Sequence, residues 1–116
     1  VGNNHASACE IARKVIEENF PPQTLHTVTT PLFGSEDFSS YQQHVPGCFI
    51  FVGCRNPDKG AVWNVHNPHF LLDEDAMKVG VKTHLSLVSK IFVKIFNKIA
   101  SVVSAALARK TPLALI

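Results

Sequence analysis

The feature that most constrains the fold is an uninterrupted apolar run, CFIFVG, at residues 48–53. It follows a Pro-Gly turn, and it lacks the polar–apolar alternation that marks a strand with one face in water. A continuous run of this length is typical of a strand covered on both faces, as in a sheet between two layers of helices. We therefore expect an α/β architecture.

An amphipathic helix is predicted near the start of the chain, over residues 4–20. Its apolar residues recur at steps of three and four, so they share one face of a helix. Asn3 or Asn4 can cap the first turn, because an asparagine oxygen accepts hydrogen bonds from the free amide groups there. Pro21 and Pro22 end the helix. The predicted apolar face consists of Ala8, Ile11, Ala12, Val15 and Ile16.

The remaining segments complete an alternation of helices and strands. Residues 24–30 are rich in β-branched side chains and predict a short strand. A long proline-free stretch from Asp73 predicts a helix, with Asp73 as its cap. The order helix, strand, helix, strand, loop, helix is that of an α/β fold.

The segment GSEDF at residues 34–38 concentrates two acids at the start of the second predicted helix. Gly34 permits a turn, and Ser35 is a candidate N-cap. Glu36 and Asp37 lie where a helix N-terminus favours negative charge. A plain helix start therefore explains these acids, and a position next to a substrate is the alternative.

Length, charge and cysteine usage limit the classes of function. A chain of 116 residues suits one small domain, and a net charge of +2 does not indicate the clustered basic face that nucleic acids require. The chain begins with Val and shows no signal-peptide pattern, so we interpret it as a piece of a longer, cytoplasmic protein. Cys9, Cys48 and Cys54 form no Cys-x-x-Cys pair, which predicts free thiols in a reducing compartment. Cys48 and Cys54 would lie roughly 20 Å apart at the two ends of a strand, too far for a disulfide.

The segment VHNPHF at residues 65–70 places His66 and His69 three positions apart around a proline. A zinc site needs three or four converging ligands, and Asp73 and Glu74 are the nearest acids. Because those acids also suit the start of the following helix, we disfavour a self-contained metal site. We favour one of the two histidines as a single ligand of a larger site.

Four short motifs occur in order over residues 33–88: Gly-Ser-Glu-Asp-Phe, Val-Pro-Gly before an apolar run, His-Asn-Pro-x-Phe, and Asp-Glu-Asp-Ala at a helix start. Together they resemble the C-terminal part of the catalytic domain in one family of metal-dependent amidohydrolases. That family includes aminoacylases, hippurate hydrolases and plant auxin-conjugate (IAA-amino acid) hydrolases, and it is akin to the di-zinc carboxypeptidases. The resemblance implies an incomplete α/β/α sandwich over residues 1–89, followed by an amphipathic helical extension over residues 90–116.

The resemblance also implies a chemistry. In the family, two divalent metals, zinc or manganese, activate a water that attacks the amide bond of an N-acyl-amino acid or a small peptide. His66 matches the last metal ligand of that site, His69 falls at a variable position, and Gly34, Ser35 and Glu36 match a segment close to the substrate. The family's Cys-Gly-His-Asp segment is absent here, and the only Glu-Glu pair lies within the first predicted helix. We therefore expect no catalytic residue in this chain and no hydrolysis by the chain alone.

Residues 89–110 form an apolar helical stretch with a polar stripe. A membrane span is disfavoured, because each lysine costs about 3 kcal/mol near a bilayer centre. A helix packed on a partner protein or on its own domain is our first interpretation, and a membrane surface is the second. A homodimer is a separate partner expectation. The alternative function is thus a non-catalytic remnant or binding module that acts through this helix. The stripe consists of Lys90, Lys94, Asn97, Lys98 and Ser101.

Overall fold

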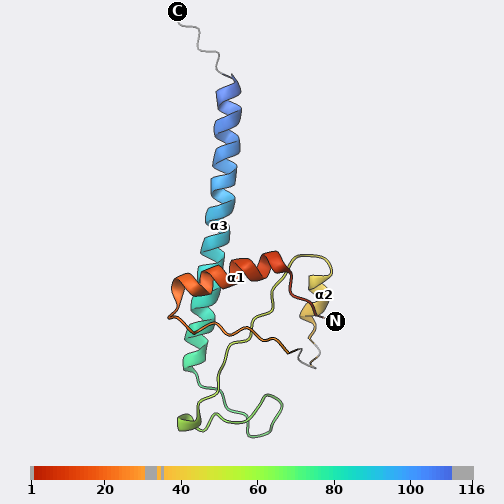
Figure 1. Ribbon diagram of the computed structural model, residues 1–116, viewed down its shortest axis with the longest axis vertical. Coiled ribbons are helices and arrows are strands. Elements are labelled where there is room, and N and C mark those ends of the chain that lie inside the picture. The colour runs from red at the N-terminus through yellow and green to blue at the C-terminus, as the bar shows by residue number, and fades with distance from the viewer. Residues whose placement is uncertain (1, 31–33, 35, 111–116) are drawn as a thin grey trace, which may run out of the picture.

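The computed structural model describes residues 2–30, 34 and 36–110, with side chains up to residue 105. These described residues form three α-helices, α1 (Ala6–Asn19), α2 (Phe38–Gln42) and α3 (Asp75–Lys110), and one 3₁₀ turn, η1 (Pro57–Lys59). Figure 1 shows α1 crossing the lower part of α3, with α2 beside the start of α1 and a long loop below.

Helix α1 confirms the helix predicted over residues 4–20. Its apolar face packs toward α3, and the residues of that face are buried or half-buried. The helix ends before Phe20, whose backbone is extended at φ −127° and ψ 159°, as expected for a residue that precedes a proline. The predicted cap is wrong: His5 occupies the N-cap position without a side-chain cap bond. The Asn4 side chain is instead bonded to the distant Phe49.

Helix α3 confirms the long helix predicted from Asp73. The Asp75 amide donates to Asp73 Oδ1 at 3.2 Å, so the Asp73 side chain caps the helix as predicted. Two lysines join α3 to α1. Lys82 Nζ donates to the Asn19 carbonyl and lies 4.6 Å from the centre of the Phe20 ring, and Lys90 Nζ lies 2.7 Å from Glu18 Oε2.

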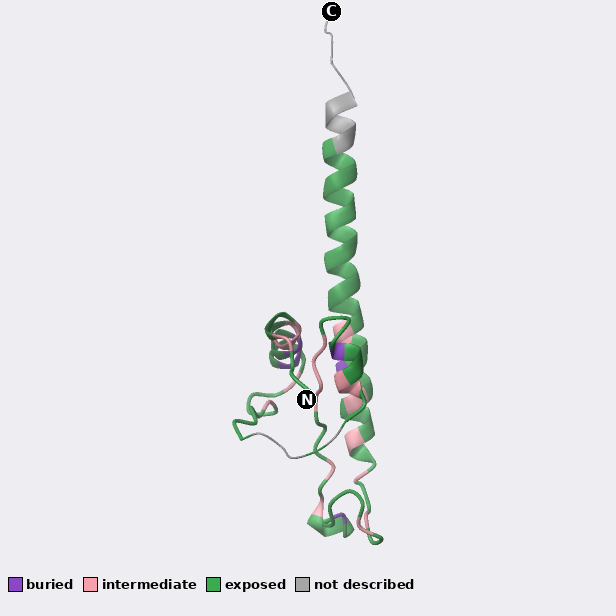
Figure 2. Cartoon of the chain, turned by 90° about the vertical axis from the view of Figure 1, so that its right-hand side faces the viewer, coloured by how far each residue is buried: buried purple, intermediate pink, exposed green. Residues whose placement is uncertain are grey.

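The buried core is small and lies mainly where α1 meets α3. Val15 is fully buried at 0% exposure, and Ala12, Ile16 and Thr83 are also buried. Figure 2 shows how few of the described residues are buried, and α3 is exposed from residue 91 to residue 105. The radius of gyration is 21.0 Å, against about 13 Å for a compact domain of this length. Most apolar side chains therefore lie on the surface.

The two predicted strands are not formed within the described residues. Residues 24–30 and 48–53 have no regular secondary structure. Among the described residues, the pairing that does occur is a single antiparallel bridge between Asn56 and Ala61, after the apolar run. A strand needs a neighbouring backbone to bond its amide and carbonyl groups. In the apolar run, the Asn4 side chain replaces a neighbouring strand at one residue: it accepts from the Phe49 amide and donates to the Phe49 carbonyl.

Aromatic contacts attach the apolar run to α2. The Phe49 ring lies 5.6 Å from Phe38 and 5.1 Å from Phe51, centre to centre, and the second pair is edge-to-face. Gln42 is buried and donates to Asn4 Oδ1 at 3.0 Å. The first residues of the run thus pack beside α1 and α2, whereas Phe51 and Val52 are 64% and 41% exposed.

Helix α3 continues far beyond its contact with α1. Every residue from 91 to 105 is exposed, including Phe92 at 67% and Phe96 at 73%. Among the described helices, none is both long and apolar enough to cross a membrane.

Candidate functional site

The loop at residues 64–70 consists of two successive turns. The Asn67 amide donates to the Asn64 carbonyl at 3.2 Å, and the Phe70 amide donates to the Asn67 carbonyl at 2.9 Å. In the second turn, Pro68 has the fixed φ that the second position favours, and Asn67 Oδ1 accepts from the His69 amide at 2.9 Å. The Asn-Pro pair therefore fixes the loop locally.

His66 occupies the third position of the first turn with a left-handed backbone, φ 69°. Glycine or asparagine is favoured there, because a β-carbon crowds the carbonyl in this conformation. A histidine held in this region costs on the order of 1 kcal/mol, and such strain concentrates at functional positions. The side chain is exposed, so its imidazole is accessible. This is the residue that the sequence marked as a candidate metal ligand.

His69, three positions further on, has a packing contact. Its ring centre lies 6.0 Å from that of Trp63, at an interplanar angle of 45°. The two histidines of the loop therefore differ in their surroundings. His66 has the unusual backbone, and His69 has an aromatic neighbour.

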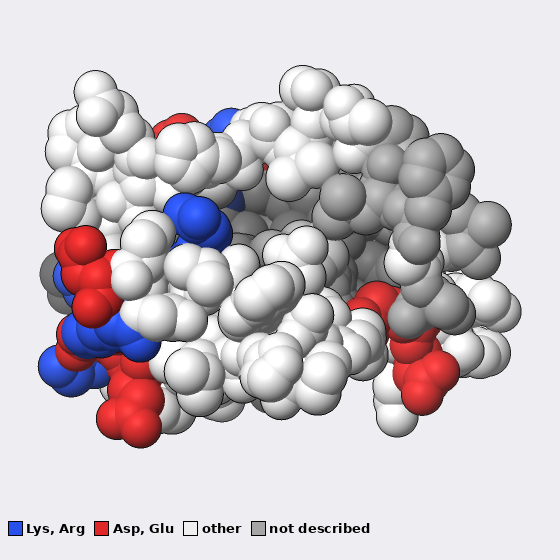
Figure 3. Space-filling model, turned by 90° about the horizontal axis from the view of Figure 1, so that it is seen from below, with Lys and Arg blue, Asp and Glu red and all other residues white. Residues whose placement is uncertain are grey.

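Asp73 and Asp75, which follow this loop, are engaged in ion pairs. Lys59 Nζ lies 2.5 Å from Asp73 Oδ1 and 2.6 Å from Asp75 Oδ2, and Lys78 Nζ lies 2.6 Å from Asp75 Oδ1. Asn56 Nδ2 donates to the other Asp73 oxygen at 2.7 Å. Figure 3 shows this mixture of charges at one edge of a largely uncharged lower face.

These partners lower the pKa values of both acids. Hydrogen bonds from Asn56 and then Lys59 lower the pKa of Asp73. Hydrogen bonds from Lys59 and then Lys78 lower the pKa of Asp75 to about 2. The same two acids raise the pKa of Lys59. Asp73, one of the two acids considered as metal ligands, thus helps to close the loop onto the start of α3.

The segment that precedes α2 lies apart from the His66 loop. Gly34, Glu36 and Asp37 are exposed, and Asp37 is the N-cap of α2 without a side-chain cap bond. Ser35 lies outside the described residues. Figure 1 shows α2 beside the start of α1, whereas the loop after η1 is at the lower end of the molecule. The structure therefore does not bring the two predicted parts of the site together.

A metal site of two ions needs more ligands than the described part of this chain brings together. Within the described residues, no three His, Cys, Asp or Glu side chains are grouped so that they could hold a metal ion. His66 supplies one imidazole, and the nearby aspartates are bonded to lysines. The residues present do not form a complete site for the metals that the motifs imply.

A pair of thiols was missed by the sequence analysis. Cys9 in α1 and Cys48 at the start of the apolar run have their sulfur atoms 3.4 Å apart. Burial, and then the hydrogen bond with Cys9, raises the pKa of Cys48 to about 11. The two residues are 39 positions apart, and no spacing motif links them. Only the packing of the run against α1 brings them together.

The chain resembles known hydrolases over its first ninety residues. The family model for peptidase family M20/M25/M40 matches residues 1–90. "IAA-amino acid hydrolase ILR1-like 6" of Arabidopsis thaliana is 38% identical over 64 residues, which are 55% of this chain and 14% of that protein. "Thermostable carboxypeptidase 2" of Saccharolobus solfataricus is 42% identical over 62 residues, which are 53% of this chain and 16% of that protein. No solved structure matches the chain.

The chain thus spans about a seventh of the length of these curated relatives. The family match covers the whole of α1, α2 and the His66 loop, and it ends within α3. The order of motifs, the strained histidine and the family match agree, and the chain belongs to peptidase family M20/M25/M40.

Proposed function

We propose that residues 1–89 are the C-terminal part of the catalytic domain of a metal-dependent hydrolase, with an α/β/α sandwich as its complete fold. The substrates are N-acyl-amino acids or small peptides, whose amide bond is cleaved. In this proposal, His66 is one ligand of a site for two divalent metals, zinc or manganese. The other ligands and the general base lie outside these 116 residues. The observation that carries the proposal is the left-handed backbone of His66 within the Asn-Pro loop.

The metals, when bound, would polarise the scissile carbonyl and supply a hydroxide near neutral pH. The role of this chain is to hold one imidazole, that of His66, in place through the two turns of residues 64–70. No hydrolytic step is assigned to its own residues. We expect the 116-residue chain to be inactive by itself.

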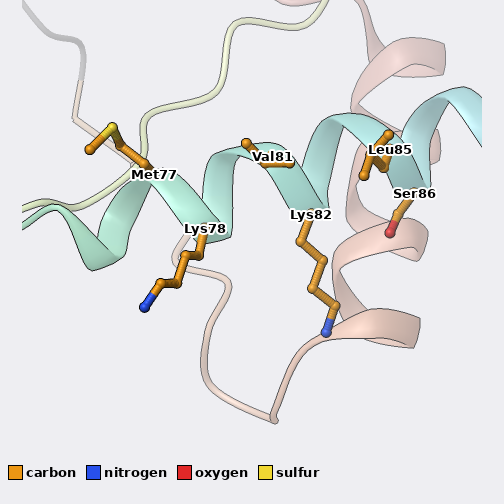
Figure 4. Close-up of a pocket in the computed structure, with 6 residues that line it drawn as sticks. All are labelled: Met77, Lys78, Val81, Lys82, Leu85 and Ser86. Atoms are coloured by element: carbon orange, nitrogen blue, oxygen red, sulfur yellow. The ribbon is translucent and has the colours of Figure 1, made fainter.

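An uncovered apolar row on α3 supports a larger domain. Met77, Val81 and Leu85 are spaced four residues apart and are 56%, 60% and 65% exposed. Figure 4 shows them on one side of α3, with Lys78, Lys82 and Ser86 on the other side. Such a row is typical of a helix face that packs against further structure. In the complete protein this face would pack against the remainder of the sandwich.

The segment at residues 34–36 is proposed to lie close to the substrate in the complete enzyme. Gly34, Ser35 and Glu36 match that position by motif. Glu36→Gln in the complete enzyme should change KM or kcat for an N-acyl-amino acid. Asp37→Asn next to it is the matched control, because Asp37 is the exposed N-cap of α2.

The test begins with the coding sequence upstream of Val1. If it continues in frame with the missing ligands, the longer protein is purified, and its metal content and its hydrolysis of N-acyl-amino acids are measured. His66→Ala should lose metal and nearly all activity, whereas His69→Ala should keep both. The two variants share one loop and one chemical change, so their difference isolates the ligand role.

Two outcomes would overturn the proposal. The first is a His66→Ala protein with full metal content and activity. The second is a stop codon close upstream of Val1, because the protein would then have no segment that could supply the other metal ligands.

A second candidate function rests on the far part of α3. Residues 91–105 are exposed although most of them are apolar, and Lys94 and Lys98 lie among them. Such a helix can bind a protein partner, such as a second copy of this chain, or it can bind an anionic membrane surface. Size-exclusion chromatography tests self-association, and co-sedimentation with anionic vesicles tests lipid binding. A monomer that stays in the supernatant would exclude self-association and lipid binding.

A further inference from the structure

The thiols of Cys9 and Cys48 lie next to each other. Their sulfur atoms are 3.4 Å apart, against about 2.0 Å in a disulfide. Both residues are half-buried rather than enclosed, so a small reagent can reach them. The two sulfurs already share a hydrogen bond.

The backbone around the thiols is held by bonds that do not involve sulfur. The His5 amide donates to the Gly47 carbonyl at 3.0 Å, and the Gly47 amide donates to His5 Nδ1 at 3.1 Å. Asn4 bonds both backbone groups of Phe49, at 2.6 and 3.0 Å. These anchors lie just before α1 and on either side of Cys48. The thiols therefore meet because the two segments are fixed to each other.

We propose that Cys9 and Cys48 form a reversible disulfide that joins α1 to the apolar run. The oxidant is a small disulfide such as glutathione disulfide. The Cys9 thiolate attacks one of its sulfurs, the sulfur–sulfur bond breaks, and one small thiol leaves with the proton that Cys9 gave up. The Cys48 thiolate then attacks the Cys9 sulfur of the mixed disulfide, and the second small thiol leaves with the Cys48 proton. Two protein thiols are oxidised, and one small disulfide is reduced to two thiols.

The order of the two steps follows from the surroundings of Cys48. Its raised pKa, about 11, leaves little thiolate near neutral pH, and the thiolate is the attacking species. Cys48 is therefore suited to the second, intramolecular step, where proximity compensates for the scarcity of the thiolate.

Chain entropy would select a different pair in the unfolded chain. Cys48 and Cys54 are six positions apart (54 − 48 = 6), whereas Cys9 and Cys48 are 39 apart, and short loops close at lower entropic cost. In the folded chain, the Cys54 carbonyl accepts from the Asp73 amide at 3.0 Å, which fixes Cys54 at the start of the lower loop. Folded and unfolded chains should thus give different disulfides.

The experiment incubates the reduced 116-residue chain with glutathione disulfide, in native buffer and in concentrated urea. Free thiols are then alkylated in acid. Chymotrypsin cuts after Phe49 or Phe51, which separates Cys48 from Cys54, and mass spectrometry identifies the linked peptides. We expect Cys9–Cys48 to exceed Cys48–Cys54 by at least about tenfold in native buffer, with the preference reversed in urea. The same ratio in both conditions, or glutathione adducts alone, would overturn the proposal.

Matched variants separate the disulfide from other effects of oxidation. Cys54→Ser keeps the pair, and its Tm should rise by roughly 10 °C on oxidation, because a loop of this length is closed. Cys9→Ser should show no such rise. Asn4→Ala leaves every thiol in place but removes an anchor, so it should lower the yield of Cys9–Cys48 severalfold, whereas Asn3→Ala should not. A yield that is unchanged in Asn4→Ala would contradict the role of the backbone anchors.

Discussion

The contact between α1 and α3 can be tested by making one substitution at two positions. Val15 in α1 is fully buried, at 0% exposure, and Val81 in α3 is 60% exposed. Val15→Ala removes two methyl groups, which lowers the free energy of unfolding by about 1.6 kcal/mol. The cavity adds roughly 0.5–1 kcal/mol to this loss, and the better helix propensity of alanine returns about 0.5 kcal/mol. The net loss is therefore about 1.5–2 kcal/mol.

The assay is hydrogen–deuterium exchange of the peptide that covers α1. A loss of this size should speed its exchange roughly 10- to 30-fold, because exchange follows the population of the open state. Val81→Ala carries the same gain in helix propensity with a much smaller loss of buried area, because Val81 is 60% exposed, so its exchange should change little. Equal acceleration in both variants would show that α1 is not held by burial against α3.

Three further changes address the charges and the turns. As the pH falls from about 4 towards 2, the pairs of Asp75 should lose their contribution to stability, because its folded pKa of about 2 lies below the ordinary value of 3.8. Exchange at the start of α3 should report this loss, and Asp75→Asn should show a smaller loss, because Asp73 keeps its bonds to Asn56 and Lys59. Gly60→Ala should cost about 1 kcal/mol because of its φ of 74°, whereas Gly53→Ala, equally free of close neighbours, should cost little; urea denaturation compares them. Lys82→Met should cost about 1–2 kcal/mol, because it removes a hydrogen bond to α1 and a contact with an aromatic ring; no change in the urea midpoint would contradict this.

Local signals in the sequence were sufficient for the long helices. The three- and four-residue spacing predicted α1 and its buried face, and the proline-free stretch after Asp73 predicted α3 with its cap. Such features depend on residues within one or two helical turns of each other, so the sequence contains the information that they need. The turn preferences of Asn67 and Pro68 are of the same local kind.

The cap of α1 shows where local reasoning fails. Asn4 is a good cap by type and position, yet its side chain bonds Phe49, 45 positions away. A single asparagine side chain can bond either the free amides of the first turn of α1 or the amide and carbonyl of Phe49. It bonds Phe49 because the apolar run packs beside α1. The predicted strand over the same run needs a partner strand, and the described residues supply none.

The order of motifs was evident from the sequence, because it depends on residue type and spacing, and the family resemblance of these motifs then singled out His66 as the candidate ligand. The tertiary structure decided what spacing cannot. It placed His66 in a left-handed turn, paired Asp73 and Asp75 with Lys59, and brought the sulfurs of Cys9 and Cys48 within 3.4 Å. Each of the last two results joins residues from separate segments, and their approach depends on how those segments pack.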